Sequence, residues 1–268
     1  MFPLYYHQLN SVPALETLCH RVVWSLVFSM VLLAATGRLG ELVKTLTTAR
    51  TFFGLLASGI CVSVNWGTYI WAVAHDQALD ASLAYFMLPL VTLGLGVILL
   101  REHLSKRQAL AVGIVFLAVA ILSIDRGNLP WIVVVLPVSF GLYGFVRKLV
   151  AVDAYVGVTI ETMLVTPLAL GYLLTRPEGG ALLTESWTIK GLLLLCGPVT
   201  TIPLVLFGFA THHMKLGTLG LLQYVNPTLQ MLVAAILLAE PLEPVRMVTF
   251  ALIWLGLLVY LWPAAKRS

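Results

Sequence analysis

Glu161 is the residue of this sequence whose chemistry most needs an explanation. It lies seven residues after Ala154 inside an apolar segment, which is about 10 Å along a helix. No basic residue stands three or four positions away, so its own helix offers no ion pair. A carboxylate at such a depth either lines a solute path or holds neighbouring helices together by hydrogen bonds. On a path, it would carry a proton or hold a cationic group.

A second charged group, Glu16, His20 and Arg21, begins another apolar segment. Glu16 and His20 are four positions apart and therefore share a helix face. They can form an interfacial ion pair with ends that reach water, or they can face a solute. In the second case His20 and Arg21 would receive an anionic group. Glu16 and Glu161 are each followed by threonine and stand at comparable places in the two halves of the chain.

Amides and aromatic residues complete the candidate set. An amide inside an apolar segment serves either helix packing or a ligand, and an aromatic ring can stack on a solute. We predict no catalytic or metal-binding residue and no cofactor. The predicted substrate path consists of Tyr5, Glu16, His20, Arg21, Asn65, Trp66, Tyr85, Tyr143, Glu161, Gln223, Tyr224 and Asn226.

These residues are positioned by a duplicated arrangement of apolar segments. Pro89 precedes Glu102 by thirteen residues, and Pro227 precedes Glu240 by thirteen, so the offset between the copies is 138. Such self-similarity indicates that one unit was used twice. We predict two repeats, at residues 1–124 and 125–268, which together form one membrane domain. The duplicated segments are residues 81–100 with 108–124, and 219–239 with 247–262.

The composition identifies a membrane protein. Sixty per cent of the residues are hydrophobic, 10% are charged, and the mean hydropathy is +0.97. A soluble domain carries about a quarter charged residues, whereas uncharged runs of about 20 residues suit a bilayer core. The net charge of +4 does not indicate nucleic acid, because the basic residues stand between apolar runs. The three cysteines are scattered among apolar neighbours and indicate neither a metal site nor a disulfide framework.

The predicted fold class is an all-α polytopic membrane protein with ten helices. The first is expected to be truncated, because the repeat offset aligns Leu142-Tyr143 with Leu4-Tyr5, yet three residues precede Leu4. A signal peptide is not indicated, since neither a basic region nor a small-residue cleavage site is present. The other nine helices are predicted at residues 14–36, 51–74, 79–100, 106–124, 128–146, 154–175, 191–211, 217–239 and 244–262.

The distribution of basic residues predicts the orientation. With a cytoplasmic amino terminus, eleven basic residues lie inside and four outside, a clear positive-inside bias. Five helices per repeat then give the two repeats opposite orientations, and inverted repeats place a substrate path at their interface. The inside set is Arg38, Lys44, Arg50, Arg101, Lys106, Arg107, Arg147, Lys148, Lys215, Lys266 and Arg267, and the outside set is Arg126, Arg176, Lys190 and Arg246.

Several motifs resemble one family along nearly the whole chain. They include CHRVVWS, VNWGTYIWAV, SLAYFMLPL, GLYGFVRK, ETMLVTPLAL, TTIPLVLFGFA and LGLLQYVNPTLQMLVA. The chain is similar to RarD-type permeases of the EamA family, in the drug/metabolite transporter superfamily. The resemblance implies ten helices in two inverted five-helix repeats. Arg101 replaces the usual glycine, Leu88 replaces the usual asparagine, and Asn226 stands where a small residue is usual.

We therefore interpret the sequence as a secondary transporter, a permease or exporter of a small organic metabolite or drug that works by alternating access. No enzyme is indicated, because the chain lacks a nucleophile elbow, a zinc motif and a phosphate loop. The expected partners are the lipid bilayer, a small solute and, as a candidate, a proton, whereas nucleic acid is not expected and a homodimer stays open. The expected location is the bacterial inner membrane with both termini cytoplasmic. The alternative is a non-transporting membrane sensor or assembly protein.

Overall fold

The computed structural model describes residues 2–100, 106–127, 131–150, 152–213, 229, 231–237 and 243–261. Within these ranges the chain is helical and contains no strand. The helices are α1 (Phe2–His7), α2 (Ala14–Ala35), α3 (Leu39–Leu46), α4 (Ala49–Ala74), α5 (Ala78–Leu100), α6 (Lys106–Arg126), α7 (Trp131–Val150), α8 (Ala154–Leu174), η1 (Pro177–Gly179), α9 (Ala181–Thr184), α10 (Trp187–His213), η2 (Val233–Leu237) and α13 (Pro244–Leu261).

The predicted all-α polytopic fold is confirmed. Each long helix begins and ends within about four residues of its predicted range, because long apolar runs bounded by charged loops specify helices strongly. The segment predicted at residues 217–239 lies largely outside the described residues. Within the described residues, four helices are long and apolar enough to cross a bilayer: Ala14–Ala35, Ala49–Ala74, Ala154–Leu174 and Trp187–Leu206.

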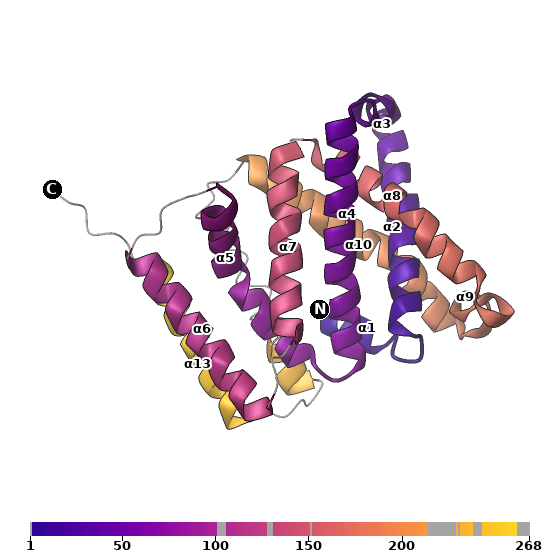
Figure 1. Ribbon diagram of the computed structural model, residues 1–268. Coiled ribbons are helices and arrows are strands. Elements are labelled where there is room, and N and C mark those ends of the chain that lie inside the picture. The colour runs from indigo at the N-terminus through magenta and orange to yellow at the C-terminus, as the bar shows by residue number, and fades with distance from the viewer. Residues whose placement is uncertain are drawn as a thin grey trace.

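Two of the predicted connections contain short helices that the apolar pattern did not indicate. The connection at residues 37–50 contains α3, and the connection at 176–190 contains η1 and α9. These elements lie at opposite ends of the bundle (Figure 1). All three helices are too short to cross a bilayer. They lie at the ends of the spanning helices.

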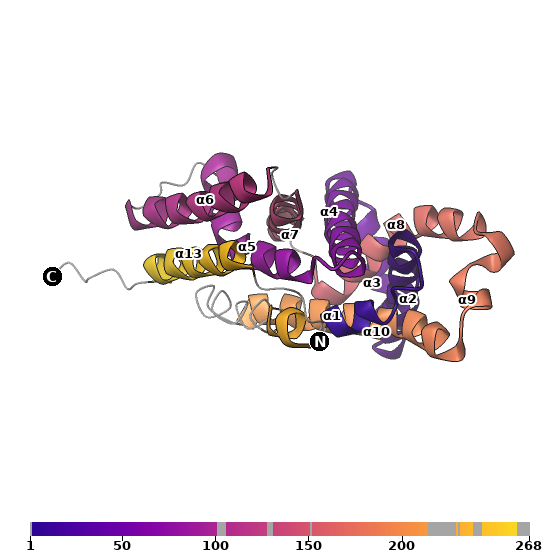
Figure 2. The ribbon, with the colours of Figure 1, turned by 90° about the horizontal axis from the view of Figure 1, so that it is seen from below.

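Helices from the two halves of the chain are interleaved. α2 packs against α8 and α10, α4 packs against α7 and α8, and α5 packs against α7. α6 and α13 pack against each other at one edge of the molecule, as both views show (Figures 1 and 2). The interior therefore lies between elements that are far apart in the sequence.

The outward and inward faces differ in polarity. Large apolar side chains face outward, among them Phe116, Leu168 and Leu174, which are 76%, 76% and 86% exposed. Several charged side chains are instead buried, including Glu16, Arg21 and Glu161. This arrangement suits a protein whose surroundings are hydrocarbon, because its charged groups must find their partners inside.

Candidate functional site

Glu161 of α8 is held by side chains of two neighbouring helices, α4 and α7. Its side chain is 2% exposed. Ser58 of α4 donates a hydrogen bond to Oε1 at 2.6 Å, and the hydroxyl of Tyr143 on α7 donates to Oε2 at 3.5 Å. Nε of Arg147, also on α7, lies 3.5 Å from Oε1. The carboxylate thus has a cation on the neighbouring helix, and hydrogen bonds from two helices hold its oxygens.

Two glycines make room for this arrangement. A Cβ on Gly157 would collide with the guanidinium of Arg147, and a Cβ on Gly59 would lie 3.1 Å from the carbonyl oxygen of Glu161. Gly157 therefore allows the arginine to reach the carboxylate. Gly59 allows α4 to approach α8 closely enough for Ser58 to bond.

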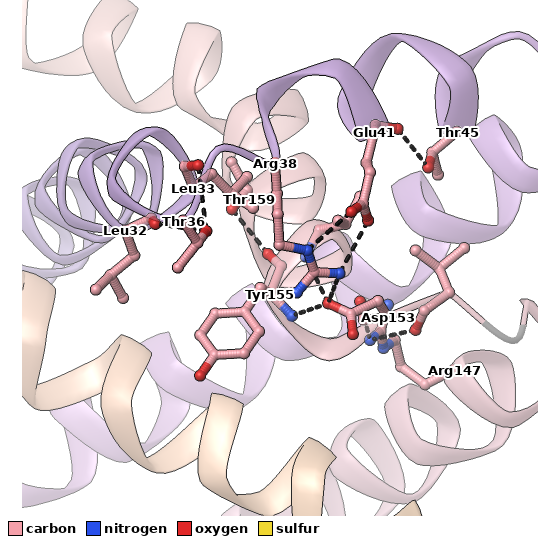
Figure 3. A network of polar contacts seen from close by, with 12 residues as sticks. Leu32, Leu33, Thr36, Arg38, Glu41, Thr45, Arg147, Asp153, Tyr155 and Thr159 are labelled. Carbon is pink, nitrogen blue, oxygen red and sulfur yellow. Dashed lines mark hydrogen bonds and ion pairs between the residues drawn. The ribbon is translucent and has the colours of Figure 1, made fainter.

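Arg147 also connects Glu161 to a polar network at the end of the bundle (Figure 3). Its Nη2 donates to the carbonyl oxygens of Val152 and Asp153 at 3.2 and 3.4 Å. The Asp153 side chain accepts from the first amides of α8 and so caps that helix. Asp153 also pairs with Arg38, whose Nη2 lies 3.1 Å from Oδ1. The connection after α2 and the connection before α8 therefore meet at this end.

Arg38 carries a second carboxylate, Glu41. The two form a bidentate pair at 2.8 and 2.9 Å, with Arg38 lying between Glu41 and Asp153 in Figure 3. The hydrogen bonds from this guanidinium lower the pKa of Glu41. Since the pair is largely exposed, its contribution to stability is small.

Glu16 is the corresponding buried carboxylate near the other end of the bundle. It is 2% exposed. Nε of Arg176 lies 3.4 Å from Oε2, and the backbone N–H of Ala181, the first residue of α9, donates to Oε1. Gly180 has φ of +70°, and a Cβ there would press on the carboxylate. Nε2 of His20 lies 4.0 Å from Oε1, and both side chains are buried inside the protein rather than extended to water.

Arg21 is buried in a different environment. It is 6% exposed, and its Nε donates to Oγ1 of Thr200 on α10 at 2.9 Å. The guanidinium lies 4.3 Å from the ring centroid of Trp66 and 5.4 Å from that of Tyr6. No carboxylate of the described residues lies within 4.0 Å of it. Since a cation inside a bilayer costs about 2.5–3.5 kcal/mol on insertion scales, cation–π contacts offset only part of that cost.

Asn65 joins α4 to its neighbours α5 and α7 by hydrogen bonds. Its Nδ2 donates to the carbonyl oxygen of Leu136 at 2.8 Å and to Ser139 Oγ at 3.3 Å, both on α7. Its Oδ1 accepts from the hydroxyl of Tyr85 at 2.9 Å. These contacts lie beside Pro137, which removes a backbone donor inside α7. Both polar ends of Asn65 are thus occupied by protein.

A chain of aromatic rings runs through the interior from α1 to the Glu161 region. Consecutive ring centroids are between 5.0 and 6.5 Å apart. At one end the Tyr5 hydroxyl donates to the Leu192 carbonyl oxygen and lies 3.3 Å from Cys196 Sγ. At the other end the last ring belongs to the tyrosine that bonds Glu161. The rings are those of Tyr5, Tyr6, Tyr69, Tyr85, Phe140 and Tyr143.

Seven of the nine described candidates of the predicted path are linked through contacts inside the protein: Tyr5, Arg21, Asn65, Trp66, Tyr85, Tyr143 and Glu161. Glu16 and His20 form a separate buried pair. The other three, Gln223, Tyr224 and Asn226, lie outside the described residues. Sequence reasoning missed the partners of these candidates. Arg147 and Arg176 were assigned only to the charge bias, and the signals near them were small residues: Gly157 beside one pair and Gly180 beside the other. The missed residues are Tyr6, Ser58, Phe140, Arg147, Arg176 and Thr200.

Known proteins match the chain along its length. The model of the EamA-like transporter family matches residues 1–124. An uncharacterized transporter of Pseudomonas aeruginosa is 42% identical over 100% of this chain and 91% of its own length. Protein RarD of Escherichia coli is 38% identical over 98% of this chain and 89% of its own length.

A solved crystal structure shares the fold, with a TM-score of 0.64 at 16% sequence identity over 99% of this chain and 96% of its own. Identity at this level informs on the fold alone. The whole-chain relatives, together with the apolar helices, identify a multi-pass bacterial membrane protein. The chain belongs to the EamA-like transporters of the drug/metabolite transporter superfamily and is a RarD-type member of that family.

Proposed function

We propose that this protein is a secondary transporter of a small organic metabolite or drug in the bacterial inner membrane. It works by alternating access of two inverted halves, residues 1–124 and 125–268, with both termini cytoplasmic. The observation that carries the proposal is the pair of buried carboxylates near opposite ends of the bundle. Glu16 has Arg176 and the backbone N–H of Ala181 from the other half of the chain. Glu161 has Ser58 from the other half and Arg147 from its own half.

The pairing of helices supports the inverted repeat. If each helix is exchanged for its counterpart in the other half, the α4–α8 contact becomes α10–α2, and the α5–α7 contact becomes the contact of η2 with α1. All four contacts are present. α2 and α8 are counterparts of each other, as are α6 and α13, so the α2–α8 and α6–α13 contacts are unchanged by the exchange. Such exchanged contacts are expected where a two-fold axis relates two halves, as it does in inverted repeats.

The contacts of the two carboxylates would hold the two ends of the solute path closed in turn. Opening one end would separate the Glu161 carboxylate from Ser58, because these residues lie on helices of different halves. Opening the other end would separate Glu16 from Arg176 for the same reason. Opening either end would therefore change the partners of one glutamate and leave those of the other in place.

Reconstitution in sealed liposomes tests transport. Vesicles loaded with an isotope-labelled bacterial metabolite extract are diluted, and mass spectrometry identifies solutes that leave. We expect efflux of a small set of solutes from vesicles with the protein and none from protein-free vesicles. The efflux is also measured with a pH gradient imposed in either direction. If the vesicles retain every solute under all these conditions, the sensor or assembly alternative is favoured, because such a protein moves nothing across a bilayer.

A further inference from the structure

One side of α2 carries a row of buried polar atoms that form no hydrogen bond with a described residue, although one of them, Nε2 of His20, lies 4.0 Å from Oε1 of Glu16. They are Oγ1 of Thr17, Nε2 of His20, Nε1 of Trp24 and Oγ of Ser25. Thr17, His20 and Trp24 follow one another at steps of three and four residues, and Ser25 stands eight residues after Thr17, so the four side chains share one broad side of the helix. Buried polar groups are ordinarily hydrogen-bonded, and most strictly so in hydrocarbon. A whole row of exceptions on one face indicates a polar ligand.

Arg21 lies in the middle of this row. Nε is bonded to Thr200, and its Nη hydrogens have no acceptor among the described residues. Both buried glutamates, in contrast, have an arginine within 3.5 Å. The charge that lacks a counter-ion at this face of α2 is therefore positive.

The unsatisfied groups define the chemistry of the ligand. An indole N–H and a guanidinium can only donate, and a hydroxyl can donate as well as accept. The ligand must therefore offer several acceptor atoms in a small volume. A guanidinium fork matches a carboxylate through two parallel hydrogen bonds, and one cation balances one negative charge. The rings of Trp66 and Tyr6 beside the guanidinium provide an apolar wall for the rest of the molecule.

We propose that this face of α2 binds the carboxylate of an organic monoacid, so that the transported solute is a monocarboxylate anion with an apolar body. Arg21 is the binding residue for the carboxylate, and Trp24, Thr17 and Ser25 supply neutral donors. This assignment rests on the proposed transport function. Glu16 is five positions before Arg21, about 7.5 Å along the helix, so the bound anion lies just inside the Glu16–Arg176 pair.

Matched pairs of acids and amides test the assignment. The purified protein is heated in detergent at pH 7.5 with benzoate, phenylacetate or hexanoate and, separately, with benzamide, phenylacetamide or hexanamide. We expect the acids to raise Tm through mass action and the amides to have little effect. Because a charge-assisted bidentate hydrogen bond is lost, Arg21→Gln should weaken the acid effect at least tenfold in concentration. Arg50→Gln, which removes an exposed arginine, should leave it unchanged.

The outcomes separate this assignment from the transport function. Amides that stabilise as well as acids, no response to any acid, inorganic phosphate that stabilises more than the acids, or an acid effect that survives in Arg21→Gln would each overturn it. If Arg21→Gln does not fold, Thr200→Val keeps the charge but removes the Nε acceptor, and it should weaken acid binding severalfold. An unchanged acid affinity in Thr200→Val would then overturn the assignment.

The vesicle experiment adds an independent readout. If neutral or cationic solutes leave the loaded vesicles, transport stands and the carboxylate assignment falls. Efflux of monocarboxylates at a rate that depends on the membrane potential supports both transport and the carboxylate assignment. If nothing leaves while the acids still stabilise the protein in an Arg21-dependent way, the binding site stands and transport falls.

Discussion

The guanidinium of Arg147 lies against Gly157, one helical turn before Glu161, in a space that a methyl group at position 157 would occupy. This contact allows an arginine of α7 to reach a carboxylate that α8 buries. The ion pair of these two helices therefore depends on a residue that carries no charge and no side chain.

Replacing Gly157 with alanine should separate Arg147 from Glu161. Breaking a buried ion pair leaves an uncompensated charge and costs about 3–5 kcal/mol, so we expect a clear drop in the Tm of the purified protein. Gly171→Ala is the matched control on the same helix, because a Cβ there meets nothing within 4 Å. Equal Tm values for the two variants would show that Arg147 moves aside without cost.

Glu161→Gln should keep the fold and membrane insertion but abolish flux driven by a pH gradient. Glutamine retains the volume and can accept from Ser58, but it cannot take up or release a proton. The measurement is solute flux in proteoliposomes with and without an imposed gradient.

Because Arg147 would lose its counter-ion in that variant, the double variant Glu161→Gln/Arg147→Gln is the appropriate control. If the single variant is unstable and the double variant is stable but still lacks the pH response, the coupling role of Glu161 holds. A full response to the gradient in either variant would favour an exchange mechanism instead.

Both termini should lie in the cytoplasm. The charge bias of eleven to four is one reason, and the Arg38–Asp153 pair gives another, because it joins two loops that the bias assigns to the same side. A carboxy-terminal fusion to alkaline phosphatase should be inactive, and one to a fluorescent protein should be bright. The opposite pattern would overturn the orientation.

The Arg38–Glu41 pair should make a small pH-dependent contribution to stability. Arg38 lowers the pKa of Glu41 below its usual value of 4.5, so the pair stabilises the folded state above that pH. The contribution is lost as the pH falls through the lowered folded-state pKa. The Tm difference between wild type and Glu41→Gln should therefore be present near pH 7 and disappear in acid. High salt should reduce the Tm difference at pH 7. A Tm difference that grows in acid would contradict this assignment.

The sequence was sufficient to predict the spanning helices because hydrophobicity over about 20 residues decides whether a segment enters a bilayer. Glu161 and Arg21 were recognisable for the same reason, since a charged residue in such a segment has few tolerable environments. Asn65 was ambiguous in the sequence, and its contacts with Leu136 and Tyr85 favour packing.

The partners could not be predicted, because pairing depends on which helix faces which. Arg147 stands in a different helix from Glu161, and Arg176 stands far from Glu16 in the chain. Hydropathy carries no information on such contacts. The short helix α3 was missed because eight residues give too little periodicity, and η1 and α9 are shorter still.

The packing of α6 on α13 has a consequence for the order of assembly during synthesis. The face of α6 formed by Ala111, Val115, Ala118 and Leu122 is buried in the core that includes Phe250 and Ile253 of α13. α13 begins 138 residues after the start of α6, so it leaves the ribosome about 7–28 s later at roughly 5–20 residues per second. During this interval α6 waits in the bilayer with lipid on the face that α13 will cover. α13 therefore completes this edge of the bundle well after α6 has been made.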